Sequence, residues 1–308
     1  MKYFLFLTFS LALLSCTSCN KNDDNNGGEV TITTPETRGL GYSLSEKDFS
    51  NTYLDLRSAL QSNPNISIVA EVNHTQNAQN NGLELPNTRV ILFGNPALGT
   101  PLMQEDQLAG LDLPQKMLVY ENADNNVFVA FNTTTYLSAR HDVGSAQTIG
   151  QISAALNNIA TGVTNGTASE NPATSITLNQ GISTVVSDNN FNLTYSKLRN
   201  SIMENENLTV VAELDHQANA QSVNMELNPT RLIVFGNPNL GTPLMQNKQT
   251  TAIDLPQKML VWEDAQGVVK ISYNTPSYLK DRHAINGNDE VINTINTALF
   301  NLAENAAN

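Results

Sequence analysis

The sequence repeats itself at a fixed distance, and this repeat limits the possible folds more than any other feature. Residues 93–104 and residues 235–246 differ at a single position, and residues 112–119 recur unchanged at 254–261. The offset is 142 residues in both cases (235 − 93 and 254 − 112), and it holds without a gap over residues 39–141 of the first copy. A repeat of this length is a whole folding unit, so the chain is expected to hold two copies of one domain.

Hydrophobic periodicity predicts the same elements in each copy. Short runs in which apolar residues alternate with polar ones indicate strands. Helical spacing follows Ser45, which with Asp48 resembles a capping box, and it returns at the end of each copy. In the first copy, strands are expected at Gly39–Leu44, Ile66–Val72, Arg89–Phe93, Lys116–Glu121 and Val127–Phe131. This order predicts an α+β fold of two tandem β-α-β(4)-α domains, each a mostly antiparallel sheet with helices packed on one face.

The domain boundaries follow from the repeat and from a polar stretch between the copies. Residues 164–174 are rich in Thr, Asn, Gly and Pro, and this composition is typical of a linker. We therefore expect a first repeat domain at 37–163 and a second at 175–308. Because the second copy contains every predicted element, it is expected to fold cooperatively without the first.

The N-terminus has the pattern of a lipoprotein signal peptide. Lys2 precedes Tyr3–Leu14, an uncharged run that is too short to span a bilayer. The run ends in Leu-Leu-Ser-Cys, which resembles a lipobox, so residues 1–15 are expected to be removed and Cys16 acylated. The acyl chains would anchor the protein in a lipid bilayer, its expected partner. A secretory signal with a chance cysteine is the less favoured alternative, and Cys19 is a weaker acylation site.

Residues 16–36 are expected to form a flexible tether, because residues 20–28 are polar and lack aromatic side chains. The acidic patch after Cys16 resembles the surface-export signal of lipoproteins in the Bacteroidetes, and plain tether composition explains it equally well. The expected location is the cell envelope, at the outer membrane, with the domains facing the periplasm or the cell surface.

Composition excludes several classes of partner. The net charge is −13, from 16 Lys and Arg against 29 Asp and Glu. Such a chain repels nucleic acid, so nucleic acid is not an expected partner. Both cysteines, Cys16 and Cys19, precede the repeats, so the domains hold neither a disulfide nor a thiolate metal site.

The repeated blocks resemble one known family. Both copies are similar to members of the domain of unknown function 302 family, over residues 39–163 and 181–308. The shared blocks are Phe-Gly-Asn-Pro, Gly-Thr-Pro-Leu-Met, Asp215-His216, Glu226-Leu227, Pro229-Thr230-Arg231, Asp254-Leu255-Pro256, Asn274-Thr275-Pro276, Tyr278-Leu279 and Arg282-His283. The resemblance implies a TATA-binding-protein-like fold and no established role. The first copy departs from the pattern with Asn73 in place of Asp and Thr134 in place of Pro, so a site that uses the carboxylate is in doubt there.

The four histidines are the first candidates for a site. They lie in register, with His74 and His141 in the first copy and His216 and His283 in the second. His74 has the parity of the core-facing residues in its strand, and His141 precedes the last helix, so the two are expected to meet at one edge of the core. A metal site or proton transfer is one interpretation, with Asp215 beside the second pair. The favoured interpretation is two hydrogen-bonded histidines that join helix to sheet, because no third metal ligand is visible.

The Gly-Asn-Pro-x-Leu-Gly-Thr-Pro-Leu-Met segment is the second candidate. Its glycines expose backbone N–H groups, and its Asn and Thr side chains add polar atoms, which together could bind an anion or a carbonyl oxygen. The polar residues concerned are Asn95, Thr100, Asn237 and Thr242. The favoured interpretation is a turn-rich connection whose Leu and Met side chains enter the core. Arg140 and Arg282, each before the second histidine of its copy, could bind an acidic ligand.

Three functional hypotheses remain. The chain has no Gly-x-Ser-x-Gly, no Cys-His arrangement and no His-Glu-x-x-His, so an enzyme that uses the histidine pair as acid and base is less favoured. A module that binds a small ligand or a metal at the cell envelope is favoured, and a structural or protein-interaction domain is the third hypothesis. The sequence specifies no cofactor and no particular metal.

Overall fold

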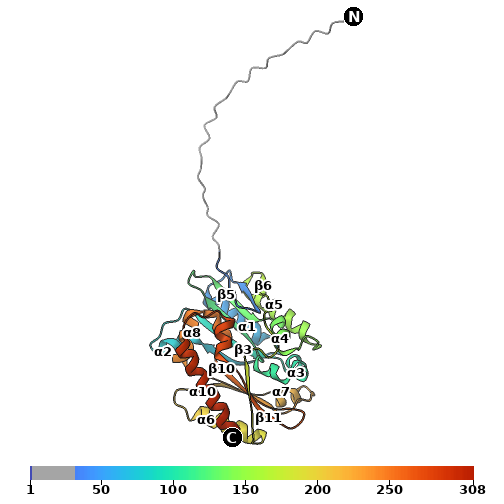
Figure 1. Ribbon diagram of the computed structural model, residues 1–308. Coiled ribbons are helices and arrows are strands. Elements are labelled where there is room, and N and C mark those ends of the chain that lie inside the picture. Colours follow the sequence, from blue (N-terminus) through green and yellow to red (C-terminus); the bar gives the residue numbers. More distant parts are fainter. Residues whose placement is uncertain (2–31) are drawn as a thin grey trace. The chain divides into compact units, whose positions relative to one another are not determined.

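The predicted strands and long helices form in both repeats. The structure is a computed structural model that describes Met1 and residues 32–308, and residues 33–308 form one compact unit that contains both repeats (Figure 1). The predicted signal peptide, Cys16 and most of the predicted tether lie outside the described residues. Within the described part, no helix combines the length and apolar character needed to cross a membrane.

The first repeat contains twelve elements. They are β1 (Leu40–Leu44), α1 (Phe49–Ser62), β2 (Ser67–Asn73), α2 (His74–Asn80), β3 (Thr88–Gly94), α3 (Pro96–Glu105), the 3₁₀ helix η1 (Gln107–Leu111), β4 (Gln115–Glu121), β5 (Val127–Asn132), α4 (Thr134–His141), α5 (Ile149–Thr164) and β6 (Ala168–Glu170). The long amphipathic helices α1 and α5 bury one face each, as their spacing predicts.

The second repeat follows the same order without a counterpart of β6. Its elements are β7 (Ile182–Val186), α6 (Phe191–Met203), β8 (Thr209–Asp215), α7 (His216–Ser222), β9 (Thr230–Gly236), α8 (Pro238–Asn247), the 3₁₀ helix η2 (Gln249–Ile253), β10 (Gln257–Glu263), β11 (Val269–Asn274), α9 (Pro276–Arg282) and α10 (Asp289–Ala307).

Each repeat builds one antiparallel sheet. The strand orders are β2-β3-β4-β5-β1-β6 and β7-β11-β10-β9-β8. This confirms the predicted fold class. The segment expected to be a linker, residues 164–174, contains β6, which pairs with β1 from Gly41 opposite Glu170. The polar stretch between the repeats therefore supplies the edge strand of the first sheet.

The two faces of each sheet have different neighbours. One face carries the helices of its own repeat, α1 with α5 and α6 with α10. The opposite face of each sheet contacts the 3₁₀ helix of the other repeat, η2 on β4 and η1 on β10. As a result, one hydrophobic core cluster contains residues of both repeats, including Leu118 and Leu260. The repeats are therefore not separate packing units.

Two local predictions need correction. The predicted capping box at Ser45 and Asp48 is not formed, because Asp48 itself is the N-cap of α1 and accepts a hydrogen bond from the Asn51 N–H at 2.9 Å. The segment after Gly94 and Asn95 is the helix α3, not a turn-rich connection, although Leu102 and Met103 are buried as expected. Asn95 caps α3 through the Ala97 N–H at 3.0 Å, and Pro96 stands in its first turn, where proline is well tolerated.

Candidate functional site

A buried ionic cluster lies at the junction between the repeats. The Asp112 carboxylate accepts hydrogen bonds from Arg140 Nη1 at 2.7 Å and from His141 Nε2 at 2.8 Å. Two residues of the second repeat complete the cluster, because Arg140 Nη2 donates to Asn274 Oδ1 at 2.8 Å and Lys258 Nζ lies 3.5 Å from Asp112. The side chains of Asp112, Arg140 and His141 are fully buried.

The same cluster occurs again with the repeats exchanged. Asp254 accepts from Arg282 Nη1 at 2.8 Å and from His283 Nε2 at 2.7 Å. Arg282 Nη2 donates to Asn132 Oδ1 of the first repeat at 2.8 Å, and Lys116 Nζ lies 4.0 Å from Asp254. Each arginine thus binds a carboxylate in its own repeat and an asparagine in the other.

The two carboxylates of the clusters are kept ionised by their partners. Burial alone would raise the pKa of Asp112, but the positive charges of Arg140 and Lys258 outweigh it and hold that pKa well below its usual range. The pKa of Asp254 is lowered in the same way, against burial, by Arg282. Removing one partner of such a buried set leaves an uncompensated charge. Because the side chains of the two clusters are buried, we assign them a structural role in holding the two repeats together.

The first histidine of each repeat lies on the other repeat. The ring of His74 lies against the backbone of Ala252 and Leu255, and that of His216 lies against the backbone of Gly110. Burial lowers the pKa of each imidazole to about 4, so both are neutral at physiological pH.

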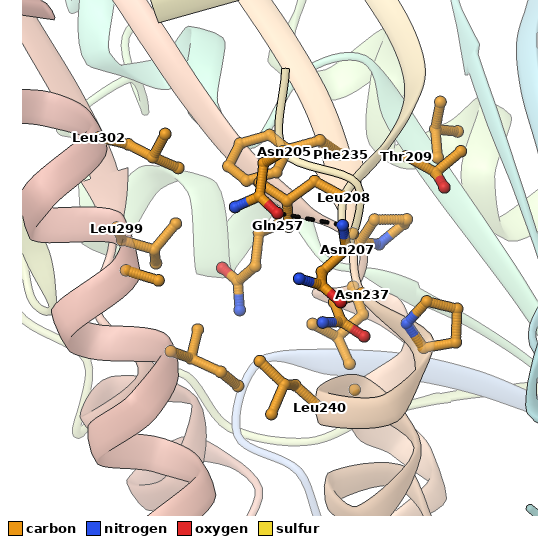
Figure 2. A pocket seen from close by; sticks show the side chains of 18 of the residues that line it. Asn205, Asn207, Leu208, Thr209, Phe235, Asn237, Leu240, Gln257, Leu299 and Leu302 are labelled. Carbon is orange, nitrogen blue, oxygen red and sulfur yellow. Dashed lines mark hydrogen bonds between the residues drawn. The ribbon is translucent and has the colours of Figure 1, made fainter. Parts of the chain in front are cut away.

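A cavity of about 720 Å³ lies in the second repeat, between α10, the sheet and the start of α8. Its apolar wall includes Phe235, Leu240, Leu299 and Leu302 (Figure 2). The first repeat contributes to the lining with Val72, His74 and Asn77. The cavity is therefore composite, built from both repeats.

Two side chains on the wall of this cavity, His74 and Gln257, have a buried nitrogen without a hydrogen-bond partner among the described residues. Gln257, the first residue of β10, is 8% exposed, and its Nε2 has no hydrogen-bond partner among the described residues. Figure 2 shows its amide pointing into the space between Leu299 and Asn237. The alternation of the strand explains this orientation, because the next residue, Lys258, points to the ionic cluster on the opposite face.

The first repeat holds a smaller counterpart of about 210 Å³. Gln115 lines it, is 9% exposed and again has an unpartnered Nε2. His216 and Asn219 of the second repeat contribute to its lining, as His74 and Asn77 contribute to the larger cavity. The two cavities are thus equivalent in construction and unequal in size.

Comparison with known proteins identifies the family. The family described as "Domain of unknown function DUF302" matches residues 42–159 and 183–302, which is most of the chain. The chain belongs to the DUF302 family. A solved structure of an uncharacterized conserved DUF302 protein from Bacillus stearothermophilus is similar to 41% of this chain and 98% of its own, with 19% identity and a TM-score of 0.38.

Curated proteins from Brucella match one part of this DUF302 chain. "Fluoride-specific ion channel FluC 1" of Brucella suis biovar 1 (strain 1330) is 43% identical over 84 residues, which is 27% of this chain and 33% of that protein. The protein of the same name from Brucella abortus biovar 1 (strain 9-941) has the same identity over 31% of its length. The chain spans about a third of the length of these relatives.

The DUF302 repeats place the sequence-predicted site residues in three locations. Asn95, Thr100, Asn237 and Thr242 line the cavities. Arg140, His141, Arg282 and His283 belong to the ionic clusters. The third location is the start of α7, where Asp215 caps the helix through the Ala218 N–H and binds Arg231 Nε at 2.8 Å.

The histidine pairs expected within each DUF302 repeat do not form one group. His141 is bonded to Asp112 of its own repeat, whereas His74 lies on the second repeat and lines its cavity. His74 contacts the backbone of Ala252 and Leu255 in the second repeat, whereas His283 is bonded to Asp254. In the described part of the chain, no three His, Cys, Asp or Glu side chains are grouped as metal ligands.

Sequence reasoning did not single out Gln115 and Gln257. Both lie in the identical Asp-Leu-Pro-Gln-Lys block of the two DUF302 repeats. The available signal was the Gln-Lys pair that begins a strand of mostly apolar residues and is identical in the two copies.

Proposed function

We propose that this protein binds a small, mainly apolar molecule in the cavity of its second repeat. The observation that carries the proposal is the cavity itself. Its volume of about 720 Å³ lies within the range of roughly 300–1,000 Å³ typical of ligand sites. Its lining combines apolar side chains with uncharged polar ones, chiefly asparagines and threonines, and the surface they present to the cavity is mainly apolar. The counterpart of about 210 Å³ lies below that range, so the second repeat is the proposed site.

The predicted ligand-binding residues divide accordingly. Asn237 and Thr242 take part in the proposed site, together with His74 from the first repeat. Arg140 and Arg282 do not, because their guanidinium groups are engaged with carboxylates in the buried clusters. The proposed ligand is therefore recognised mainly through its apolar surface, and not through an acidic group bound by these arginines.

The hydrocarbon dye diphenylhexatriene tests this proposal, because it fluoresces strongly only in apolar surroundings. We expect residues 20–308, which retain the whole compact unit, to bind the dye. Val211 lines the large cavity and Val69 is its counterpart in the small one. Val211→Phe should fill the large cavity and weaken dye binding by about tenfold, while the matched Val69→Phe should leave it unchanged.

Two outcomes would contradict the proposed site. One is the absence of dye binding by the unaltered protein. The other is equal loss of binding in the two valine variants, which would place the dye elsewhere. Melting temperatures of both variants show whether each still folds.

We further propose that the protein is exported and anchored in the outer membrane through acylated Cys16, with no nucleic acid as partner. The uncharged Tyr3–Leu14 run and the lipobox-like Leu-Leu-Ser-Cys sequence support this. Cys16→Ser should move the protein from the membrane fraction to the soluble fraction, whereas Cys19→Ser should not. Membrane retention of the Cys16→Ser protein would refute the proposal.

A further inference from the structure

The large cavity contains no charged side chain. None of the residues that line it is Asp, Glu, Lys or Arg, and the same holds for the small cavity. The titratable residue on its wall, His74, is neutral, because burial lowers its pKa to about 4. A charged ligand group inside this cavity would lose its hydration without gaining a counter-ion, which costs free energy.

Further lining residues of the cavity are polar and uncharged. Asn205 and Asn207 lie in the turn after α6, with the Asn207 N–H donating to Asn205 Oδ1 at 3.0 Å (Figure 2). Asn301 and Asn305 of α10 also line the cavity. These amides offer hydrogen bonds to an uncharged group and no ion pair to a charged one.

The inner polar group is the Gln257 amide. It makes no side-chain hydrogen bond with any described residue, although the side chain is more than nine-tenths buried. An unpaired buried amide destabilises the folded protein. Gln115 is in the same situation in the small cavity. Both repeats therefore keep an unpaired amide at the same position, facing a cavity in each case.

We propose that the ligand is an uncharged amphiphile whose apolar part lies against Leu299 and Phe235 and whose inner end pairs with the Gln257 amide. An amide offers one acceptor oxygen and two donor hydrogens. The best complement is a ligand group that both donates and accepts, such as a carboxamide or a hydroxyl. This inference rests on the proposed function and adds the chemical class of the ligand.

The site includes the first repeat, which supplies His74 and Asn77. With His74 neutral, that wall adds a polar surface without charge. The ligand therefore contacts both repeats at once.

Displacement of diphenylhexatriene tests the chemical class. The competitors are octanamide, octanol, octanoate and octylammonium, which share one alkyl chain and differ in the head group. We expect octanamide and octanol to displace the dye at concentrations at least tenfold lower than the two ions. Equal displacement by octanoate or octylammonium would overturn the inference but leave the proposed cavity standing. Failure of the unaltered protein to bind the dye would instead refute the proposed function.

Gln257→Leu tests the partner. This variant keeps the size of the side chain and removes the amide. It should weaken octanamide binding about tenfold, the value of one hydrogen bond, with the dye affinity of each variant measured first so that displacement is compared on the same basis. It should also raise the melting temperature because a buried unpaired amide is gone. Gln115→Leu should raise the melting temperature without changing octanamide binding. Unchanged octanamide affinity in Gln257→Leu would overturn the inference.

Discussion

At the scale of single residues, His74 and His216 make stability depend on pH. Their pKa is about 4 in the folded protein and about 6.5 in an unfolded chain. A histidine whose folded pKa is lowered stabilises the fold fully above the unfolded pKa. As pH falls below about 6.5, only the unfolded chain takes up the proton, so stability is lost until the folded pKa is reached.

We therefore expect the free energy of unfolding to fall between pH 7.5 and pH 4.5 by roughly 2–3 kcal/mol for each of these histidines. The double variant His74→Gln, His216→Gln should lose less stability over the same interval. Urea unfolding at the two pH values measures the difference. The interval lies above the pKa of an ordinary aspartate, so protonation of Asp112 and Asp254, whose pKa values are lowered, does not contribute. Equal pH dependence of the two proteins would contradict this account.

At the scale of elements, glycines at the entrance to each repeat fix how the chain enters the first strand. Gly181 precedes β7 with φ +69°, and a Cβ added there would lie 2.1 Å from Cγ of Tyr278. Gly39 has the same place before β1, with φ +66° and Tyr136 as its neighbour. Both tyrosines lie under arginines of the ionic clusters, Arg140 over Tyr278 at 4.5 Å and Arg282 over Tyr136 at 3.9 Å.

Gly181→Ala should therefore destabilise the protein by several kcal/mol, more than backbone strain alone explains. Gly267 is the matched control, because its φ is +77° but no atom lies within 4 Å of an added Cβ. Gly267→Ala should cost only about 1–2 kcal/mol, the usual cost of a left-handed L-residue. Chemical unfolding of both variants gives the comparison, and similar losses would refute the steric role of Tyr278.

The sequence predicted those elements that carry a strong period. The strands β1–β5 and the helices α1, α5 and α10 have such patterns and are confirmed within a few residues. The helices α2 and α4 were missed because they are only 7 and 8 residues long, which is too short for a periodic signal. α3 was taken for a turn-rich segment because it contains Pro101 as well as Pro96.

The candidate site was less predictable than the fold for a physical reason. The register of the repeats correctly indicated that His74 and His216 occupy equivalent places. The register could not show that each histidine contacts the other repeat. A sequence pattern within one copy does not indicate which surface will cover a given residue. The same holds for Gln257, which faces a cavity that is lined in part by α10, a helix distant from it in sequence.

At the scale of the whole molecule, the repeats depend on each other. They share a hydrophobic core cluster, and each arginine of the clusters donates across the junction. The segments that precede the first strand of each repeat also contact the other repeat. Thr37 is hydrogen-bonded to Thr250 at 2.8 Å, and the carbonyl of Gln180 accepts from Arg140 Nε at 3.0 Å. The second copy is expected to fold cooperatively without the first, but on its own it would expose the surface that this arrangement buries.

We expect the fragment 175–308 to be less stable than residues 20–308 and to melt at a temperature that rises with protein concentration. The fragment exposes the surface that contacts the first repeat in the whole protein. Because the two repeats are similar, a second copy of the fragment can cover this surface. Calorimetry over a range of concentrations, with sedimentation to measure mass, tests this. A monomeric fragment that melts at the temperature of the longer protein would contradict it.

The unequal cavities have a consequence for how such a protein changes over generations. In a symmetric dimer of two identical chains with these contacts, any substitution would alter both cavities in the same way. One chain that carries both copies is free of that constraint. Here the second cavity measures about 720 Å³ and the first about 210 Å³. Joining the copies in one chain thus allows the cavity of one repeat to change size while the other keeps its own.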